Sequence, residues 1–371
     1  MRMPEPISAE KLNRHLRFWD KLTPGEGGYI SVVPCRPDIA PNPLPVPKNL
    51  EEAWLSSEYA LRQTQNWIES HVFLQDAIPT HFVNLGPGVM APMLGSGYSL
   101  QPTTVWFDTA PIISDFEHVP ELTLNREHRL YQVVKDQIDL LSKESNGVYK
   151  VSFTDIGGTL DILASLRGNQ DLLMDVIDYS DEIAAVCHRI DELFIEYFNE
   201  QAGWLREAGV GFTNWIGLVH EKTWYPLQCD FSTMISPAMF EKLVLPSLEY
   251  TSSQMDTSLY HLDGPEEIRH LDMILSVPNI HSIQWVPLPG TLLPNGSTQR
   301  HFDDEESIEV YRRTLSAGKK LVLLGVPPHQ ITDIYRAVGT SDGIFISTDC
   351  SDYDDAKDLV DSLCRDGWIR P

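Results

Sequence analysis

The stretch from Met234 to Gly264, MISPAMFEKLVLPSLEYTSSQMDTSLYHLDG, decides the fold. Ser236 is a suitable N-cap and Pro237 suits the first position of a helix, so a helix is predicted to begin here. Residues 257–260 then form a short β-prone run, which Gly264 ends. The stretch therefore predicts a helix that leads into a short apolar strand.

Two polar side chains, His261 and Asp263, mark the carboxyl end of that strand. Because side chains two residues apart on a strand share a face, both are expected to point the same way. In a barrel of parallel strands, the catalytic groups lie at this end.

Strands and helices alternate from residue 80 to the C-terminus. The expected strands are 80–85, 148–154, 210–217, 257–263, 280–286, 319–325 and 343–349. Mostly apolar strands that alternate with helices indicate a buried parallel sheet. About seven strands favour an α/β fold of the (β/α)8 TIM barrel type, with an open sheet as the alternative. The catalytic barrel domain is expected to span residues 76–371.

Residues 1–75 are expected to form an N-terminal extension packed on the barrel. Residues 8–22 and 50–69 have helical patterns, whereas Cys35 to Pro47 is too rich in proline to be helical.

Composition limits the partners. The formal charge of −25 argues against nucleic acid, because phosphate contacts need clustered Lys and Arg. It also disfavours an anionic membrane, and no apolar run is long enough to span one. The five scattered cysteines suit a reducing cytoplasm. No dinucleotide-binding glycine fingerprint or P-loop follows any expected strand.

Several expected strands end on polar or aromatic residues, which are Asn84, Asp155, Asn214, Trp215, His261, Asp263, Trp285 and Cys350. A thiolate, an imidazole and a carboxylate at one rim could bind zinc and leave one position open. The alternative is structural, since a single histidine at a strand end is more often hydrogen-bonded and a single cysteine is more often buried and inert.

The segment after residue 217 adds further candidates. His220 or Glu221 could do acid–base work, and Trp224 and Tyr225 could pack on a flat substrate. A solvated polar pair with the aromatic rings folded inward is the alternative. Asp230 either caps a turn or faces the active-site cleft.

Residues 149–364 resemble the uroporphyrinogen decarboxylase superfamily. The resemblance is carried by Gly158–Gly168 (GTLDILASLRG), by Cys229–Pro246 (CDFSTMISPAMFEKLVLP) and by Tyr260–Gly264 (YHLDG). The resemblance implies a distorted (β/α)8 barrel. Members of this superfamily include cobalamin-dependent methyltransferases that act on thiols.

In the zinc-containing methyltransferases of this superfamily, a His-X-Cys motif ends one strand and a second cysteine follows the last strand. His261 matches the histidine and Cys350 matches the distant cysteine, while Asp263 stands in place of the first cysteine. The resemblance therefore implies zinc ligands at His261, Asp263 and Cys350. A carboxylate in place of a thiolate makes the site harder.

The arginine-rich, glycine-rich N-terminal stretch of the true decarboxylases is missing from residues 1–75, which favours the methyltransferase branch. The resemblance then implies zinc-dependent methyl transfer between a small methylated substrate or thiol and a cobalamin carried by a separate corrinoid protein. Superfamily members are often dimers, so the resemblance is compatible with a homodimer but leaves the oligomeric state open. The alternatives are a metal-free lyase that uses Asp155, Asp230 or His220 in proton transfer, and a non-catalytic relative that retains the barrel.

The substrate site of the proposed methyltransferase is expected to be lined by side chains from strand ends and from the segment after residue 217. They are Asn84, Asn214, Trp215, Trp224, Tyr225 and Trp285, with His220, Glu221, Asp155 and Asp230 as the catalytic candidates.

Overall fold

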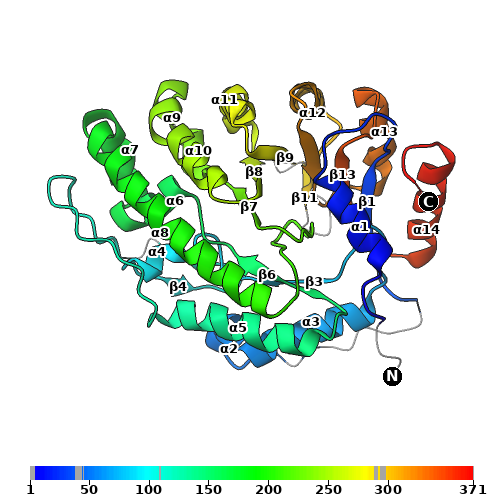
Figure 1. The fold of residues 1–371 in the computed structure, drawn as a ribbon, viewed down its shortest axis with the longest axis horizontal. Coiled ribbons are helices and arrows are strands. Elements are labelled where there is room, and N and C mark those ends of the chain that lie inside the picture. The colour runs from blue at the N-terminus through cyan, green and yellow to red at the C-terminus, as the bar shows by residue number, and fades with distance from the viewer. Residues whose placement is uncertain are drawn as a thin grey trace.

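The computed structural model describes residues 5–37, 44, 46–107, 110–287, 291–292 and 298–370. It has an α/β fold in which helices follow most of the strands (Figure 1). The helices are α1 Ala9–Phe18, α2 Leu50–Leu55, α3 Ser57–Ser70, α4 Met90–Met93, α5 Arg129–Ser145, α6 Thr159–Arg167, α7 Asn169–Asp178, α8 Ser180–Glu207, α9 Pro237–Leu243, α10 Leu245–Ser253, α11 Leu271–Ser276, α12 Glu305–Ser316, α13 Pro328–Val338 and α14 Tyr353–Arg365, with 3-10 turns η1 Asp230–Met234 and η2 Pro265–His270. The strands are β1 Tyr29–Pro34, β2 Leu74–Gln75, β3 Thr80–Val83, β4 Ser99–Leu100, β5 Val105–Trp106, β6 Lys150–Thr154, β7 Trp224–Leu227, β8 Thr257–Asp263, β9 Ile280–Val286, β10 Thr291–Leu292, β11 Thr298–Gln299, β12 Lys320–Leu323 and β13 Ile344–Cys350.

The main sheet has seven strands in the order β2-β1-β13-β12-β9-β8-β7. All neighbours in it are parallel except β1 and β2. A separate parallel pair joins β3 to β6. The carboxyl ends of β1, β13, β12, β9, β8 and β7 therefore lie along one edge, where the expected site residues are.

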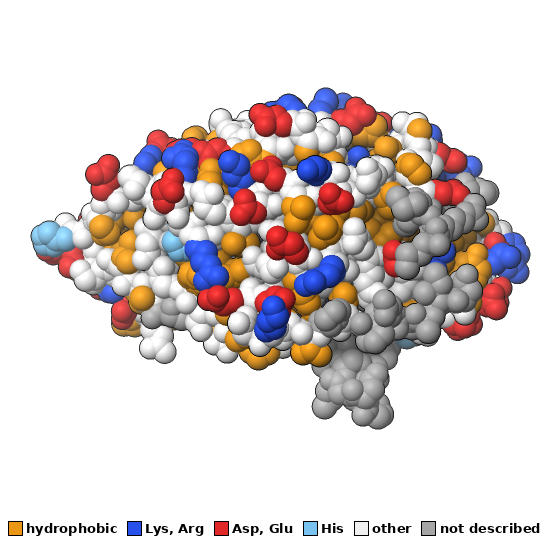
Figure 2. All heavy atoms as spheres, turned by 90° about the horizontal axis from the view of Figure 1, so that it is seen from below, with side chains coloured by type: hydrophobic (Ala, Val, Ile, Leu, Met, Phe, Trp, Pro, Cys, Tyr) orange, Lys and Arg blue, Asp and Glu red, His pale blue; other side chains and the backbone are white. Residues whose placement is uncertain are grey.

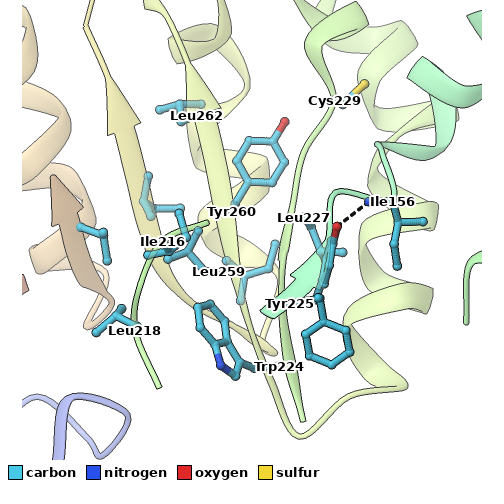
Figure 3. Close-up of a cluster of buried hydrophobic side chains, with 14 of the residues drawn as sticks. Ile156, Ile216, Leu218, Trp224, Tyr225, Leu227, Cys229, Leu259, Tyr260 and Leu262 are labelled. Atoms are coloured by element: carbon cyan, nitrogen blue, oxygen red, sulfur yellow. Dashed lines mark hydrogen bonds between the residues drawn. The ribbon is translucent and has the colours of Figure 1, made fainter. Parts of the chain in front are cut away.

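The strand pairing does not show the closed barrel that the sequence predicted. Within the described residues, no ladder joins β6 to β7 or β1 to β3, so the main sheet stays open. A side chain bridges the gap between β6 and β7. The Tyr225 hydroxyl accepts from Ile156 N at 2.7 Å and donates to Thr154 O at 3.0 Å, where backbone hydrogen bonds would otherwise join the strands (Figure 3).

The N-terminal segment contributes directly to the sheet. β1 lies within the range expected to be an extension, yet it pairs in parallel with β13 over its whole length, from Tyr29 with Phe345 to Pro34 with Cys350. The run YISVVP is β-prone, but the proline-rich stretch behind it obscured the strand. Helix α1 begins as predicted, with the Ser8 hydroxyl accepting from Lys11 N at 3.3 Å.

The strand expected at 210–217 is wrong. Within the described part of the chain, that segment makes one bridge, between Phe212 and His220, and one backbone hydrogen bond from Phe153 N of β6 to Thr213 O at 3.0 Å. The strand that pairs with β8 is β7. Pro226 argued against a strand in the sequence, because proline cannot donate to a ladder. β7 lies at the end of the sheet order, so one of its edges carries no ladder and can accommodate proline.

The core lies between the strands and the surrounding helices. Figure 1 shows α9 to α14 in an arc outside β7, β8, β9 and β13, with α3 and α5 together on another side. Buried aromatic and aliphatic side chains from β7 and β8, including Trp224, Leu227, Leu259 and Tyr260, fill the inside (Figure 3).

No helix among the described residues is long and apolar enough to cross a membrane. On the face in Figure 2, Lys and Arg side chains are scattered among Asp and Glu and form no basic patch.

Candidate metal centre

Three donor side chains converge at the carboxyl ends of the neighbouring strands β7 and β8. One ligand atom from each of Asp230, His261 and Asp263 lies within 4.8 Å of the others. His261 and Asp263 share a face of β8, as predicted, and Asp230 begins η1 just after β7. Asp230 and Asp263 are exposed and His261 is half-buried, so the group is open to solvent.

His261 is held by a buried amide on the next strand. Its Nδ1 hydrogen-bonds to Gln284 Oε1, and the Gln284 amide nitrogen donates to Trp285 O at 3.2 Å. Because the amide nitrogen is committed to that carbonyl, the amide oxygen faces His261 and accepts from Nδ1–H. The neutral ring then presents the lone pair of Nε2, which is the form that binds metals.

Asp161 fixes the backbone that carries Asp230. Its carboxylate accepts from Asp230 N at 3.0 Å and from Phe231 N at 2.7 Å, where η1 begins. The approach is close at Gly158, where a Cβ atom would overlap the Asp161 carboxylate and the backbone oxygen of Gln228. A residue with no side chain is therefore needed there.

Several carboxyl groups lie close together around this site. Burial, and then the charge of Asp230, raises the pKa of Asp155 to about 7. The same two causes raise the pKa of Asp161 to about 7. The surrounding protein desolvates the Asp230 carboxylate and raises its pKa although the residue is partly open to solvent, while His261 lowers that pKa and Asp263 raises it. Burial, and then the charge of Asp230, raises the pKa of Glu267 well above its usual range. A divalent cation would relieve this repulsion.

Asp155 lies at the end of β6, as expected from the sequence. It is buried, and its Oδ1 accepts from Gly157 N at 3.0 Å and from the Gln228 amide at 3.4 Å. With a pKa of about 7, it holds its proton part of the time at neutral pH.

Cys350 is not part of this group of donors. It ends β13, and two strands, β9 and β12, separate β13 from β8. Three strand spacings amount to about 14 Å along a sheet. Burial, and then Asp349, raises the pKa of the Cys350 thiol. Of the three expected ligands, the structure therefore brings His261 and Asp263 together, and the third donor beside them is Asp230 in place of Cys350.

Among the expected substrate-binding residues, Trp215 lies beside the group. Its ring stands edge-on to His261, with centroids 6.3 Å apart, and also contacts Phe82 and Tyr225. Asn84 and Asn214 instead cap turns, their side-chain oxygens accepting from Gly86 N and Ile216 N respectively.

Three other aromatic residues are used in packing. Trp224 is fully buried, donates to Phe212 O at 3.0 Å and packs on Trp19 with centroids 4.5 Å apart. Tyr225 is buried in the same cluster (Figure 3). Trp285 is buried and donates to Ser307 Oγ at 2.9 Å.

His220 and Glu221 precede β7, so they lie toward the opposite edge of the sheet from Asp230. His220 Nδ1 accepts from Lys222 N at 2.7 Å, and its ring packs on Trp19. The structure does not bring this pair to the carboxyl ends of the strands.

Asp161, Gln284 and Glu267 were not predicted as site residues from the sequence. Gln284 had a usable signal, since it is a polar residue beside Trp285 near the carboxyl end of a β-prone run. Asp161 stood only within the stretch Gly158–Gly168 that carries the family resemblance, and nothing in its spacing connects it with residues 230 and 231.

The sequence matches no known family model and no curated protein. The fold is similar to the solved structure of a methyltransferase from Methanosarcina mazei, with a TM-score of 0.54 and 12% identity, over 85% of this chain and 90% of that chain. At this identity the likeness concerns the fold, which is an α/β fold with a mostly parallel sheet.

Proposed function

We propose that the protein is a methyltransferase that uses a divalent metal ion, zinc first, bound by Asp230, His261 and Asp263. The observation that carries the proposal is the convergence of these three donors at the carboxyl edge of the sheet. The similarity of the fold to a protein named a methyltransferase supports the reaction class.

The donor set suits a catalytic ion. Catalytic zinc sites have three protein ligands from nitrogen, oxygen or sulfur and leave a fourth position for water or substrate. Solvent-exposed carboxylates and a histidine with its Nε2 free meet that description. When bound, the ion would act as a Lewis acid that activates a thiol acceptor or polarises a methyl donor.

The protein's own side chains then have separable tasks. Gln284 keeps the His261 ring oriented, and Asp161 holds the backbone at Asp230. Asp155, with a pKa of about 7, can take the proton of a thiol acceptor. The Trp215 ring forms an apolar wall next to His261 for a small substrate.

The other partner in transfer would be a cobalamin held by a separate corrinoid protein, in keeping with the family that the sequence resembles. We further infer that β1, β3, β6, β7, β8, β9, β12 and β13 are the eight strands of a distorted barrel, in which Tyr225 bridges the gap between β6 and β7.

The test uses free methylcobalamin as the methyl donor and a panel of small thiols as acceptors, with zinc-loaded protein. Demethylation of the cobalamin that stops on chelation, returns with zinc and is lost in His261→Ala supports the proposal. Cys350→Ser is the matched control and is expected to retain activity. Absence of demethylation with every thiol, or turnover indifferent to chelation, would reject it.

A metal-free lyase is the second candidate, favoured by the pKa of about 7 at Asp155, which suits an acid–base group at neutral pH. It predicts turnover that resists chelators and is lost in Asp155→Asn.

A further inference from the structure

Cys35 and His71 form a close pair outside the candidate metal centre. Cys35 directly follows β1 and His71 directly follows α3, and the two face each other in an antiparallel bridge. The backbone hydrogen bonds of this bridge belong to their neighbours, as from Val72 N to Pro34 O at 2.9 Å. In an antiparallel pair, residues without mutual backbone bonds bring their side chains closest together.

The imidazole of His71 is oriented to accept from the thiol. Its Nδ1 lies 2.8 Å from Trp67 O, and because a carbonyl only accepts, Nδ1 carries the hydrogen. The Ser70 hydroxyl, 3.0 Å from the same nitrogen, donates to Asn66 O and can therefore also accept from it. Nε2 is left with a lone pair, and it lies 3.8 Å from Cys35 Sγ.

Cys35 differs from the other four cysteines in its exposure. It is exposed, whereas Cys187, Cys229 and Cys350 are buried and Cys364 is half-buried. A carboxylate also lies near the imidazole. Burial raises the pKa of Asp349, and the charge of His71 acts on it in the opposite direction. Asp349 therefore lies close enough to the His71 ring to interact with it electrostatically.

We propose that Cys35 and His71 form a nucleophilic thiol–imidazole site whose substrates are small disulfides. His71 Nε2 takes the proton of Cys35, and the thiolate attacks one sulfur of the disulfide. A new S–S bond forms between Cys35 and that sulfur, the original S–S bond breaks, and the leaving thiolate takes the proton back from His71. The disulfide is the only oxidant, so the step is balanced.

Cys35 lies at the same edge of the main sheet as the candidate metal centre. β1 and β8 belong to the same run of parallel strands, so Cys35 and His261 are both at its carboxyl edge. A substituent on Cys35 would be carried on that edge. The proposal is independent of methyl transfer, because it uses none of the metal-binding residues.

The test follows release of the coloured thiol from 5,5′-dithiobis(2-nitrobenzoic acid) at pH 7, with mass spectrometry to locate the modified cysteine. Thiolate is the reacting form, and His71 Nε2 lies in position to take the thiol proton, so Cys35 is expected to react about tenfold faster than free cysteine. His71→Gln should remove about this factor, and Cys364→Ser should leave the fast phase unchanged.

A second measurement needs no variant. In urea-unfolded wild type, Cys35 should slow to the rate of free cysteine, while the three buried cysteines should speed up. A Cys35 rate that is equal in the folded and unfolded protein, or unchanged in a folded His71→Gln variant, would overturn the proposal.

Discussion

The aspartate side chains at the candidate metal centre have different roles although they carry the same functional group. Asp230 and Asp263 offer free carboxylates, whereas the carboxylate of Asp161 is occupied with the backbone of residues 230 and 231. His261 is a ligand candidate only in one tautomer, and Gln284 selects that tautomer.

Replacing Gln284 tests this selection. Gln284→Leu removes the acceptor for Nδ1–H and should weaken metal binding about 10–100-fold, the usual loss when a residue that orients a ligand is removed. Gln284→Glu retains an acceptor and should lose much less. Calorimetric titration with zinc measures both, and equal affinities in the two variants would contradict the role assigned to Gln284.

At the residue scale the sequence predicted two of the three donors that come together. His261 and Asp263 were predictable because alternation along one strand places them on one face. Asp230 was expected only as a catalytic or capping candidate, since its approach to His261 depends on the pairing of β7 with β8 and not on spacing along the chain. Cys350 was chosen through a family resemblance, and no local pattern tied it to β8.

At the element scale, the junction between β6 and α6 positions the centre. Gly158 caps α6 in extended conformation, and Asp161 in its first turn reaches across to η1. Helix starts such as Ser8 and Ser236 were predictable because N-caps are local. β7 was not, because its proline is tolerated only through its place at the end of the sheet.

Gly158→Ala tests the close approach at this junction. The added methyl overlaps Asp161 and Gln228, and overpacking of this kind costs about 1–3 kcal/mol, so urea denaturation should show that loss together with weaker metal binding. Gly203→Ala in α8 is the control. Apart from its chain neighbours and the backbone of its own helix, no atom of the described residues lies within 4 Å of its added methyl, so it should stabilise the protein by up to about 1 kcal/mol.

At the scale of the whole molecule, buried carboxyl groups make stability depend on pH. Asp155 and Asp161 have pKa values of about 7 in the folded chain, against 3.8 for an unperturbed aspartate. Between these values the folded state holds protons that the unfolded state has released. The stability they contribute is therefore present at low pH and is lost as pH rises through about 7.

Relative to Asp155→Asn, the metal-free wild type should therefore lose about 2 kcal/mol of stability on going from about pH 5.5 to about pH 7.5. Buried histidines with lowered pKa values, such as His81, act in the opposite direction, but they do so equally in both proteins. Urea denaturation of the two proteins across this range measures the difference, and a pH dependence that is the same in both would contradict the placement of Asp155.

The fold class was predictable because strand and helix periodicities are local, whereas barrel closure was not. Whether β6 meets β7 through a ladder or through Tyr225 depends on side-chain packing inside the sheet. β1 was not predicted as a strand of the main sheet for a similar reason, because its partner β13 lies at the other end of the chain.

Zinc titration of the metal-free protein, by calorimetry with elemental analysis, tests the central claim most directly. We expect one equivalent to bind to wild type and to Cys350→Ser, and the affinity to fall more than about a hundredfold in His261→Ala and Asp230→Asn, since losing a ligand costs more than losing the residue that orients one. Absence of stoichiometric binding in wild type, or full affinity in His261→Ala, would contradict it.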